Sequence, residues 1–190
     1  MPGPRILVFG GSIRTGSWSA RLAALAAKEL ALLDADVSLV SLVDYPMPIY
    51  DGDLEASKGV PEPAKKLRAM MNAHRGVYIA TPEYNASVPP LLKNAIDWVS
   101  RPGAGGEDPY KRCIFTLGST SNGRFGGYRA LMALRTVLEL GLQALVLPNQ
   151  VALSHVGHAF DDAGNIKDEI VAKLLHTSLS RLIAAVESEL

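Results

Sequence analysis

The chain has 190 residues, of which 48% are hydrophobic, 20% charged and 6% aromatic, a composition typical of one globular domain. Because 19 basic residues balance 19 acidic ones, the charge favours neither nucleic acid nor an anionic membrane as a partner. The single cysteine, no leader and no apolar run of ~18 residues predict one cytoplasmic domain over residues 1–190, without internal disulfide or membrane helix.

Hydrophobic patterning predicts five strands that alternate with five helices. Short apolar runs bounded by glycine or proline indicate buried strands, and apolar residues at three- and four-residue spacing indicate amphipathic helices. The expected strands are 5–9, 37–43, 76–80, 113–117 and 144–147, and the expected helices are 19–33, 61–75, 88–99, 127–140 and about 166–186. We expect a loop between Tyr45 and Val60, and an end to the last strand at Pro148.

This alternation predicts an α/β fold with an open five-stranded parallel sheet and helices on both faces. An eightfold barrel is excluded, because it needs about 250 residues. Ligands of open parallel sheets bind at the carboxyl ends of the strands. The loops that follow the strands are therefore the candidate functional segments.

The loop after the first strand has the composition of an anion site, with the sequence Gly-Gly-Ser-Ile-Arg-Thr-Gly-Ser-Trp-Ser over residues 10–19. Glycines permit close backbone approach, and the following helix offers unpaired N–H groups. Hydroxyl groups and the Arg14 fork could surround a phosphate, each charge-assisted bond contributing roughly 1.5–3 kcal/mol. The alternative is that the glycines only shape a turn and that Ser17 or Ser19 is an ordinary N-cap.

Two common nucleotide loops do not fit this segment. From Gly11 the spacing matches a P-loop until Ser17, where the lysine that contacts a triphosphate is missing. The dinucleotide pattern Gly-x-Gly-x-x-Gly is missing as well. A cofactor with a single phosphate is the better prediction.

Two further loops are polar and flexible enough to hold a planar heterocycle. After the third strand comes Thr-Pro-Glu-Tyr-Asn-Ala-Ser-Val-Pro over residues 81–89, and the helix that follows includes Leu-Lys-Asn-Ala-Ile-Asp-Trp over residues 92–98. The fourth strand runs into a loop rich in glycine and serine over residues 118–127. Together with Gly-Ser-Ile-Arg-x-x-Ser in the first loop, the second motif strongly resembles the NAD(P)H-dependent FMN reductase family, which includes quinone, chromate and azo reductases.

The resemblance implies a flavodoxin-like sheet of strand order 2-1-3-4-5, bound FMN, NADPH or NADH as reductant, and a homodimer or homotetramer. It implies hydride transfer to FMN and then two electrons to a small-molecule acceptor such as a quinone, by a ping-pong mechanism without a catalytic side chain or metal. The cofactor-binding residues carried over by position fall into three groups: Ser12, Ile13, Arg14, Thr15, Gly16, Ser17, Trp18 and Ser19 at the phosphate; Pro82, Glu83, Tyr84 and Asn85 along the isoalloxazine ring; and Gly118 with Ser119 at its other edge.

Two other function classes share these loops. A flavodoxin-like electron carrier would bind FMN without oxidising NAD(P)H, but such carriers are usually acidic, and this chain is neutral. A binding or regulatory module with a vestigial site is disfavoured because both loops keep their polar residues.

Several further residues carry narrower expectations. Lys93 and Asp97 should pair across one helical turn, and Cys113 should be a buried hydrophobe. Trp98 is expected at a subunit interface more than in the core. His155 and His158 lack the partners of a metal site and should lie at a surface or interface.

Three charged residues near the expected ring and nicotinamide positions have open roles. Glu83 could be an intersubunit salt-bridge partner and contribute only backbone to the flavin. Arg124 and Arg101 are candidates for the 2′-phosphate of NADPH.

Overall fold

Five parallel strands form the central sheet in the computed structural model, which describes residues 3–188. The strand order is β2-β1-β3-β4-β5, so the predicted order is confirmed. The strands are β1 (Arg5–Gly10), β2 (Asp36–Ser41), β3 (Gly76–Pro82), β4 (Ile114–Thr120) and β5 (Leu145–Leu153). Because β1, β3 and β4 lie inside the sheet between two helical layers, they carry the continuous apolar runs seen in the sequence.

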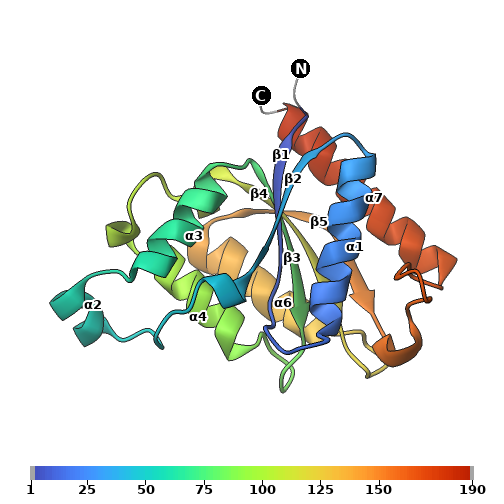
Figure 1. The fold of residues 1–190 in the computed structure, drawn as a ribbon, viewed down its shortest axis with the longest axis horizontal. Helices are drawn as coiled ribbons and strands as arrows, with labels where there is room; N and C mark the ends of the chain where they lie inside the picture. The colour runs from blue at the N-terminus through green and yellow to red at the C-terminus, as the bar shows by residue number, and fades with distance from the viewer. Residues whose placement is uncertain (1–2, 189–190) are drawn as a thin grey trace.

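Helices cover both faces of this sheet, as predicted (Figure 1). One face packs against α1 (Trp18–Leu32) and α7 (Glu169–Ser188), and the other against α3 (Glu62–Asn72), α4 (Pro90–Val99) and α6 (Tyr128–Arg135). Each helix buries one apolar stripe, and the two resulting cores are separated by the sheet. Removal of this apolar surface from water is the main force that stabilises the arrangement.

The predicted end of the last strand at Pro148 is wrong, because β5 continues to Leu153. Within residues 3–188, β5 pairs only with β4, and the register shifts between Phe115 and Leu117, which face Val146 and Gln150. Proline has no N–H to donate, but a bulge in an edge strand does not require one there. The strand therefore passes through Pro148 and carries the chain to the carboxyl edge of the sheet.

The predicted loop from Tyr45 to Val60 contains a helix, α2 (Gly52–Lys58), with Asp51 as its N-cap. The short helix α5 (Pro109–Arg112) is also absent from the prediction, and the expected helix 127–140 is α6 followed by a π-helical segment, Thr136–Gly141. With seven and four residues, α2 and α5 are too short to show a hydrophobic period. In Figure 1, α2 projects outward beyond α3 and α4.

Trp98 lies in the core and not at an exposed face, which corrects the expectation of a subunit interface. Its side chain is fully buried, and its indole N–H donates to the Pro48 carbonyl at 2.8 Å. Asn94 Nδ2 donates to the same carbonyl at 2.9 Å, and its Oδ1 accepts from the Tyr50 amide at 2.8 Å. Two residues of the Lys-Asn-Ala-Ile-Asp-Trp motif thus fasten the segment before α2 onto α4.

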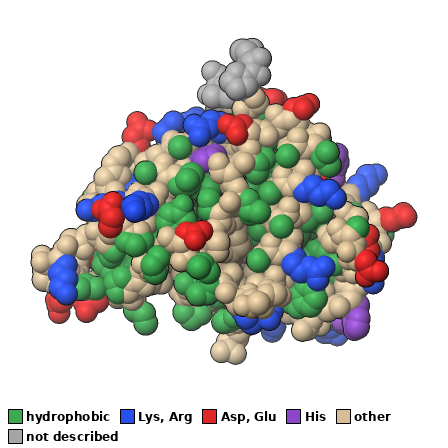
Figure 2. Space-filling model, in the orientation of Figure 1, with side chains coloured by type: hydrophobic (Ala, Val, Ile, Leu, Met, Phe, Trp, Pro, Cys, Tyr) green, Lys and Arg blue, Asp and Glu red, His purple; other side chains and the backbone are tan. Residues whose placement is uncertain are grey.

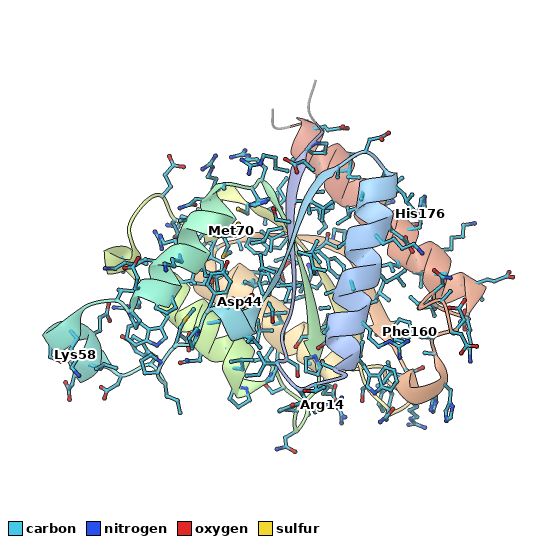
Figure 3. The ribbon with its side chains drawn as sticks, viewed as in Figure 1. Arg14, Asp44, Lys58, Met70, Phe160 and His176 are labelled. Atoms are coloured by element: carbon cyan, nitrogen blue, oxygen red, sulfur yellow. The ribbon has the colours of Figure 1, made fainter. Side chains whose placement is uncertain are left out.

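All five strands point their carboxyl ends toward one edge of the sheet, opposite the start of β1 and the end of α7 (Figure 1). Arg14 lies at this edge, in the loop between β1 and α1 (Figure 3). Within residues 3–188, no helix combines the length and apolar character that a membrane crossing requires. The carboxyl edge is where the predicted site residues meet.

Candidate functional site

The loop between β1 and α1 ends in a buried pair of serines. Ser17 is the N-cap of α1, and its Oγ accepts from the Ala20 amide at 3.4 Å. The Ser17 and Ser19 hydroxyl groups lie 2.9 Å apart and are 4% and 0% exposed, respectively. Since the first amides of a helix have no intrahelical acceptor, this end of α1 presents backbone N–H groups toward the carboxyl edge.

Arg14 occupies the exposed rim of this loop. Its guanidinium donates to the carbonyls of Thr15 at 3.2 Å and Gly16 at 3.4 Å, and its amide donates to Ser12 Oγ at 3.3 Å. Gly16 has φ +68°, a left-handed conformation that favours glycine. The Arg14 side chain therefore orders the loop and keeps a positive charge beside the N-terminus of α1.

A cavity of about 250 Å³ brings the first and second predicted loops together. Its walls come from Gly11 to Arg14 on one side and from Tyr84 and the start of α4 on the other, where Pro89, Pro90 and Leu91 lie. A Cβ at Gly11 would lie 3.0 Å from Leu92 Cδ2, which is tighter than ordinary packing allows. Glycine at this position thus lets the first loop approach α4.

The second loop, after β3, is a tight turn that protrudes at the carboxyl edge. Tyr84 and Ser87 exchange two backbone hydrogen bonds, each of 3.0 Å. Asn85 and Ala86 between them have φ +47° and +63°, so both central residues are left-handed, as in a type I′ turn. Asn85 is at home in this conformation, and the turn leaves Tyr84 about half exposed beside the cavity.

The Glu83 carboxylate binds the N-terminus of α6 within the same chain. Oε1 accepts from Arg129 Nε at 3.0 Å and from a second guanidinium nitrogen, while Oε2 accepts from the amides of Arg129 and Ala130 at 3.2 and 3.4 Å. The Arg129 guanidinium holds the pKa of the Glu83 carboxyl below its usual range. The expected intersubunit partner of Glu83 is therefore replaced by an intrachain one.

Ser119 anchors the loop after β4, and glycines allow its backbone conformation and close packing. Ser119 is fully buried, and its Oγ donates to the Gly126 carbonyl at 2.7 Å. Gly127 has φ +86°, and a Cβ there would lie 2.9 Å from Ser119 Cβ. A Cβ at Gly118 would overlap the Tyr78 hydroxyl, so glycine at 118 is required by packing beneath the site. Ser119 and Gly118 can offer backbone groups to a ligand more readily than side chains.

The two arginines considered for a nucleotide phosphate differ in their surroundings. Arg101 Nε donates to Glu55 at 2.9 Å, and its guanidinium lies 5.4 Å from the Tyr50 ring centroid. Arg124 stacks at 4.7 Å over Phe125 and has no acidic partner among residues 3–188. Of the two, Arg124 is the one available to an anion.

The structure also places the residues with narrower expectations. Lys93 and Asp97 pair at 2.7 Å, as predicted. Cys113 is buried, which raises the pKa of its thiol to about 11, so it is a packing residue. His155 and His158 are exposed, and no cluster of three or more metal-ligand side chains occurs among the described residues.

Sequence reasoning missed Arg129, Phe125 and the start of α4 as parts of this edge. Arg129 is 46 residues from Glu83, so no local pattern links the two. One signal was present: Gly127 precedes α6 where a capping side chain usually stands, which implies that the cap comes from elsewhere. Trp18, predicted at the phosphate, stacks on Phe160 with ring centroids 6.1 Å apart.

The residues at this edge fit FMN. The N-terminus of α1 with Arg14 offers amides and a fixed cation to a phosphate, and the cavity beside it is bordered by one aromatic ring and by backbone. Each predicted cofactor-binding residue lies in one of the three loops at the carboxyl edge, at the strand ends that lead into them, or in the first turn of α1. Individual contacts to the cofactor stay predictions.

Comparisons with known proteins agree with this assignment. The family model for NADPH-dependent FMN reductase matches residues 4–158. An NAD(P)H-dependent FMN reductase from Pseudomonas aeruginosa is 34% identical over 180 residues, which is 94% of this chain and 92% of that protein. A quinone reductase from Pseudomonas putida is 34% identical over 165 residues, covering 86% of this chain and 85% of the relative.

Solved structures show the same architecture. FerB, a flavoenzyme NAD(P)H:(acceptor) oxidoreductase from Paracoccus denitrificans, is similar with a TM-score of 0.74 at 27% identity, covering 97% of this chain and 98% of that one. An NADH:FMN oxidoreductase, EMOB, is similar in fold with a TM-score of 0.70 at 18% identity, covering 96% and 89% of the two chains. The chain therefore belongs to the NADPH-dependent FMN reductase family and is a flavin-dependent NAD(P)H oxidoreductase.

Proposed function

We propose that the protein binds FMN at the carboxyl edge, oxidises NAD(P)H there and reduces a small quinone-like acceptor by a ping-pong mechanism. The observation that carries this proposal is the cavity between the Arg14 loop and Tyr84, which joins an anion-binding helix end to a space bordered by an aromatic ring. The quinone reductase relatives support the acceptor class. When bound, FMN supplies the redox chemistry, taking hydride from NAD(P)H and returning two electrons to the acceptor.

The chain's own residues bind and orient the cofactor. Arg14 and the first amides of α1 neutralise the phosphate, because a helix N-terminus and a guanidinium both favour an anion. The turn from Tyr84 to Ser87 and the backbone at Gly118 and Ser119 border the ring position. In this proposal no side chain of this edge has to donate or accept a proton.

Arg124 is the residue we propose for the phosphate that distinguishes NADPH from NADH. It lies in the loop after β4, stacks on Phe125 and carries a charge without an acidic partner among the described residues. An Arg124→Ala substitution should raise the KM for NADPH and leave the KM for NADH unchanged. An equal change in both would show that Arg124 does not read this phosphate.

The competing function is an electron carrier that binds FMN without oxidising NAD(P)H. Carriers usually dock through acidic surfaces, whereas this chain has 19 basic and 19 acidic residues. On the face shown in Figure 2, acidic and basic side chains are interspersed and no large acidic patch is visible. Charge therefore favours small-molecule partners over a protein or nucleic-acid partner.

One purified sample tests the proposal. The protein saturated with FMN should be yellow, lose its colour with NADPH under anaerobic conditions and regain it when a quinone is added. A yellow protein that NADPH does not bleach would be a carrier. A protein that is colourless once unbound FMN has been removed would have no flavin function. Double-reciprocal plots for NADPH and quinone should be parallel, and intersecting lines would exclude the ping-pong mechanism.

We further propose that the protein works in the cytoplasm as a homodimer or homotetramer. Exposed apolar side chains on the outer helices support association, with Leu32 of α1 75% exposed and Ile170 of α7 74% exposed. Light scattering on the purified protein measures the mass directly. A mass equal to that of a monomer at micromolar concentration would overturn the proposed oligomeric state.

A further inference from the structure

Contacts inside the protein occupy all the acceptor positions of the Glu83 carboxylate. A carboxylate has about four lone-pair sites, and Glu83 receives four N–H contacts: two from the Arg129 guanidinium and one each from the amides of Arg129 and Ala130. Its side chain is only 6% exposed. No acceptor site on this carboxylate is left for a cofactor.

The helix that Glu83 contacts lacks a cap of its own. The N-cap of α6 is Gly127, which has no side chain to accept from the first turn. An N-cap oxygen normally accepts from the second or third helical amide, and those are the amides of Arg129 and Ala130 that Glu83 binds. Glu83 therefore caps α6 from the loop after β3 and places a negative charge at the positive end of the helix.

The start of α6 is also tied to β4. Ser119 Oγ donates to the Gly126 carbonyl at 2.7 Å, and the close approach of Gly127 to Ser119 leaves no room for a side chain. The entry to α6 is thus fixed from both neighbouring strands, by Glu83 after β3 and by Ser119 on β4. These are the two strands whose ends border the expected ring position.

We propose that Glu83 is a positioning residue that sets the separation between the loop after β3 and the N-terminus of α6, and so the width of the space for the isoalloxazine ring. It acts through α6, and its carboxylate does not touch the cofactor. The contacts of Glu83 with Arg129 and Ala130 are called the Glu83 brace below. The role in ring binding rests on the proposed function, whereas the brace itself does not.

The experiment uses the full chain and five variants, one of them a control. Glu83→Ala removes the brace, Arg129→Met removes only the guanidinium half, and the double variant removes both. Glu83→Gln keeps one oxygen for the helix amides but loses the charge. Asp97→Asn is the matched control, because it breaks an ion pair of 2.7 Å that lies within α4 alone.

Hydrogen exchange of the Arg129 and Ala130 amides, measured without flavin, reports the brace directly. In Glu83→Ala these amides should exchange on the order of tenfold faster than in the unmodified protein, and Glu83→Gln should recover part of the protection. Asp97→Asn should leave them unchanged. Unchanged exchange in Glu83→Ala would overturn the brace.

FMN titration reports the effect on the ring position. Glu83→Ala should weaken FMN binding by about tenfold and Arg129→Met by less. The double variant should match Glu83→Ala, because the proposal places the effect of Arg129 in its contact with Glu83 and not in its contact with the Phe125 ring at 5.9 Å. The visible absorption band of bound FMN should shift in Glu83→Ala, because the ring is held less closely. Weakened FMN binding in Glu83→Ala without faster exchange of the Arg129 and Ala130 amides would mean direct contact of Glu83 with the cofactor and would overturn the positioning role.

Failure of the proposed function gives a different pattern. If the unmodified protein does not bind FMN, or binds it without bleaching by NADPH, the proposed function fails. The amide exchange still decides whether Glu83 caps α6, because that measurement contains no flavin. The two results are therefore separable in one set of proteins.

Discussion

The phosphate loop and the ring side of the site are stabilised in different ways. The phosphate loop, residues 10–19, is ordered by contacts within itself, from Arg14 to the carbonyls of Thr15 and Gly16 and from Ser17 to Ser19. The ring side, comprising residues 82–87 and 118–127, is ordered by contacts between distant segments, chiefly Glu83 with Arg129. A self-contained loop can be recognised from a short sequence motif, whereas a braced pair of loops requires the fold.

The difference also predicts how the two regions respond to mutation. A change in the phosphate loop should alter the affinity for phosphate and leave the rest of the edge in place. A change on the ring side should spread to a second loop, because each of these loops is held by the other. The following substitutions test this contrast.

Arg14→Ala should have the largest effect. It removes the cation from the rim of the loop, and loss of one charge-assisted bond of about 1.5–3 kcal/mol should weaken FMN binding by roughly 10–100-fold. Fluorescence titration of FMN measures the change. Riboflavin, which has no phosphate, should bind equally to both proteins.

Two further variants interpret the Arg14 result. Arg14→Lys keeps the charge without the planar fork and should recover part of the affinity. Lys66→Ala removes an exposed cation from α3 and should change nothing. Full FMN affinity in Arg14→Ala would show that the loop binds phosphate through its backbone alone.

Gly118→Ala should have the next largest effect, and it should act through packing on the ring side. The new Cβ would overlap the Tyr78 hydroxyl, which is buried and has no hydrogen-bond partner among residues 3–188. Overpacking of this kind costs about 1–3 kcal/mol of unfolding free energy, measurable by urea denaturation. Gly52→Ala is the control, because no heavy atom lies within 4 Å of a Cβ there.

Tyr78→Phe removes the overlapping atom and an unpaired buried hydroxyl. Alone it should raise the unfolding free energy by up to about 1 kcal/mol, since a buried polar group without a partner is costly. Combined with Gly118→Ala it should recover part of the lost stability, and the two changes should not be additive. Additive effects would mean that the alanine at 118 is accommodated by a movement of β4 instead.

Continuous apolar runs predicted the five strands and the three loops that follow them, whereas the strand order was implied only by the family resemblance that motifs such as Gly-Ser-Ile-Arg carry. Sequence reasoning missed α2, whose seven residues are too few to show a helical period, and it ended β5 at Pro148, where only the pairing partner reveals a bulge. It placed Trp98 at an interface, because the Pro48 carbonyl that receives its N–H is 50 residues away. Local chemistry was visible, and long-range hydrogen bonds were not.

Acid should weaken the Glu83 brace. The pKa of Glu83 in the folded protein lies below its ordinary value, so the brace contributes stability above about pH 4.3, the unfolded value, and loses it as the pH falls through the folded pKa. Glu83→Gln cannot titrate there. The difference in unfolding free energy between the two proteins should be constant near neutral pH and shrink below about pH 4.3. A difference that stays constant down to pH 3 would mean that the carboxylate charge does not stabilise the fold.

Ala86→Gly should have the smallest effect and the opposite sign. Ala86 has φ +63° in the turn between Tyr84 and Ser87, a conformation that costs a residue with a Cβ roughly 1–2 kcal/mol. Glycine removes this cost but gains freedom in the unfolded chain, so the net stabilisation should be about 0.5–1 kcal/mol, or a few degrees in Tm. Ala24→Gly, in the exposed interior of α1, should instead destabilise by about 1 kcal/mol, because its backbone is right-handed. If both substitutions lowered Tm equally, the turn in solution would not have the left-handed backbone on which the position of Tyr84 beside the cavity depends.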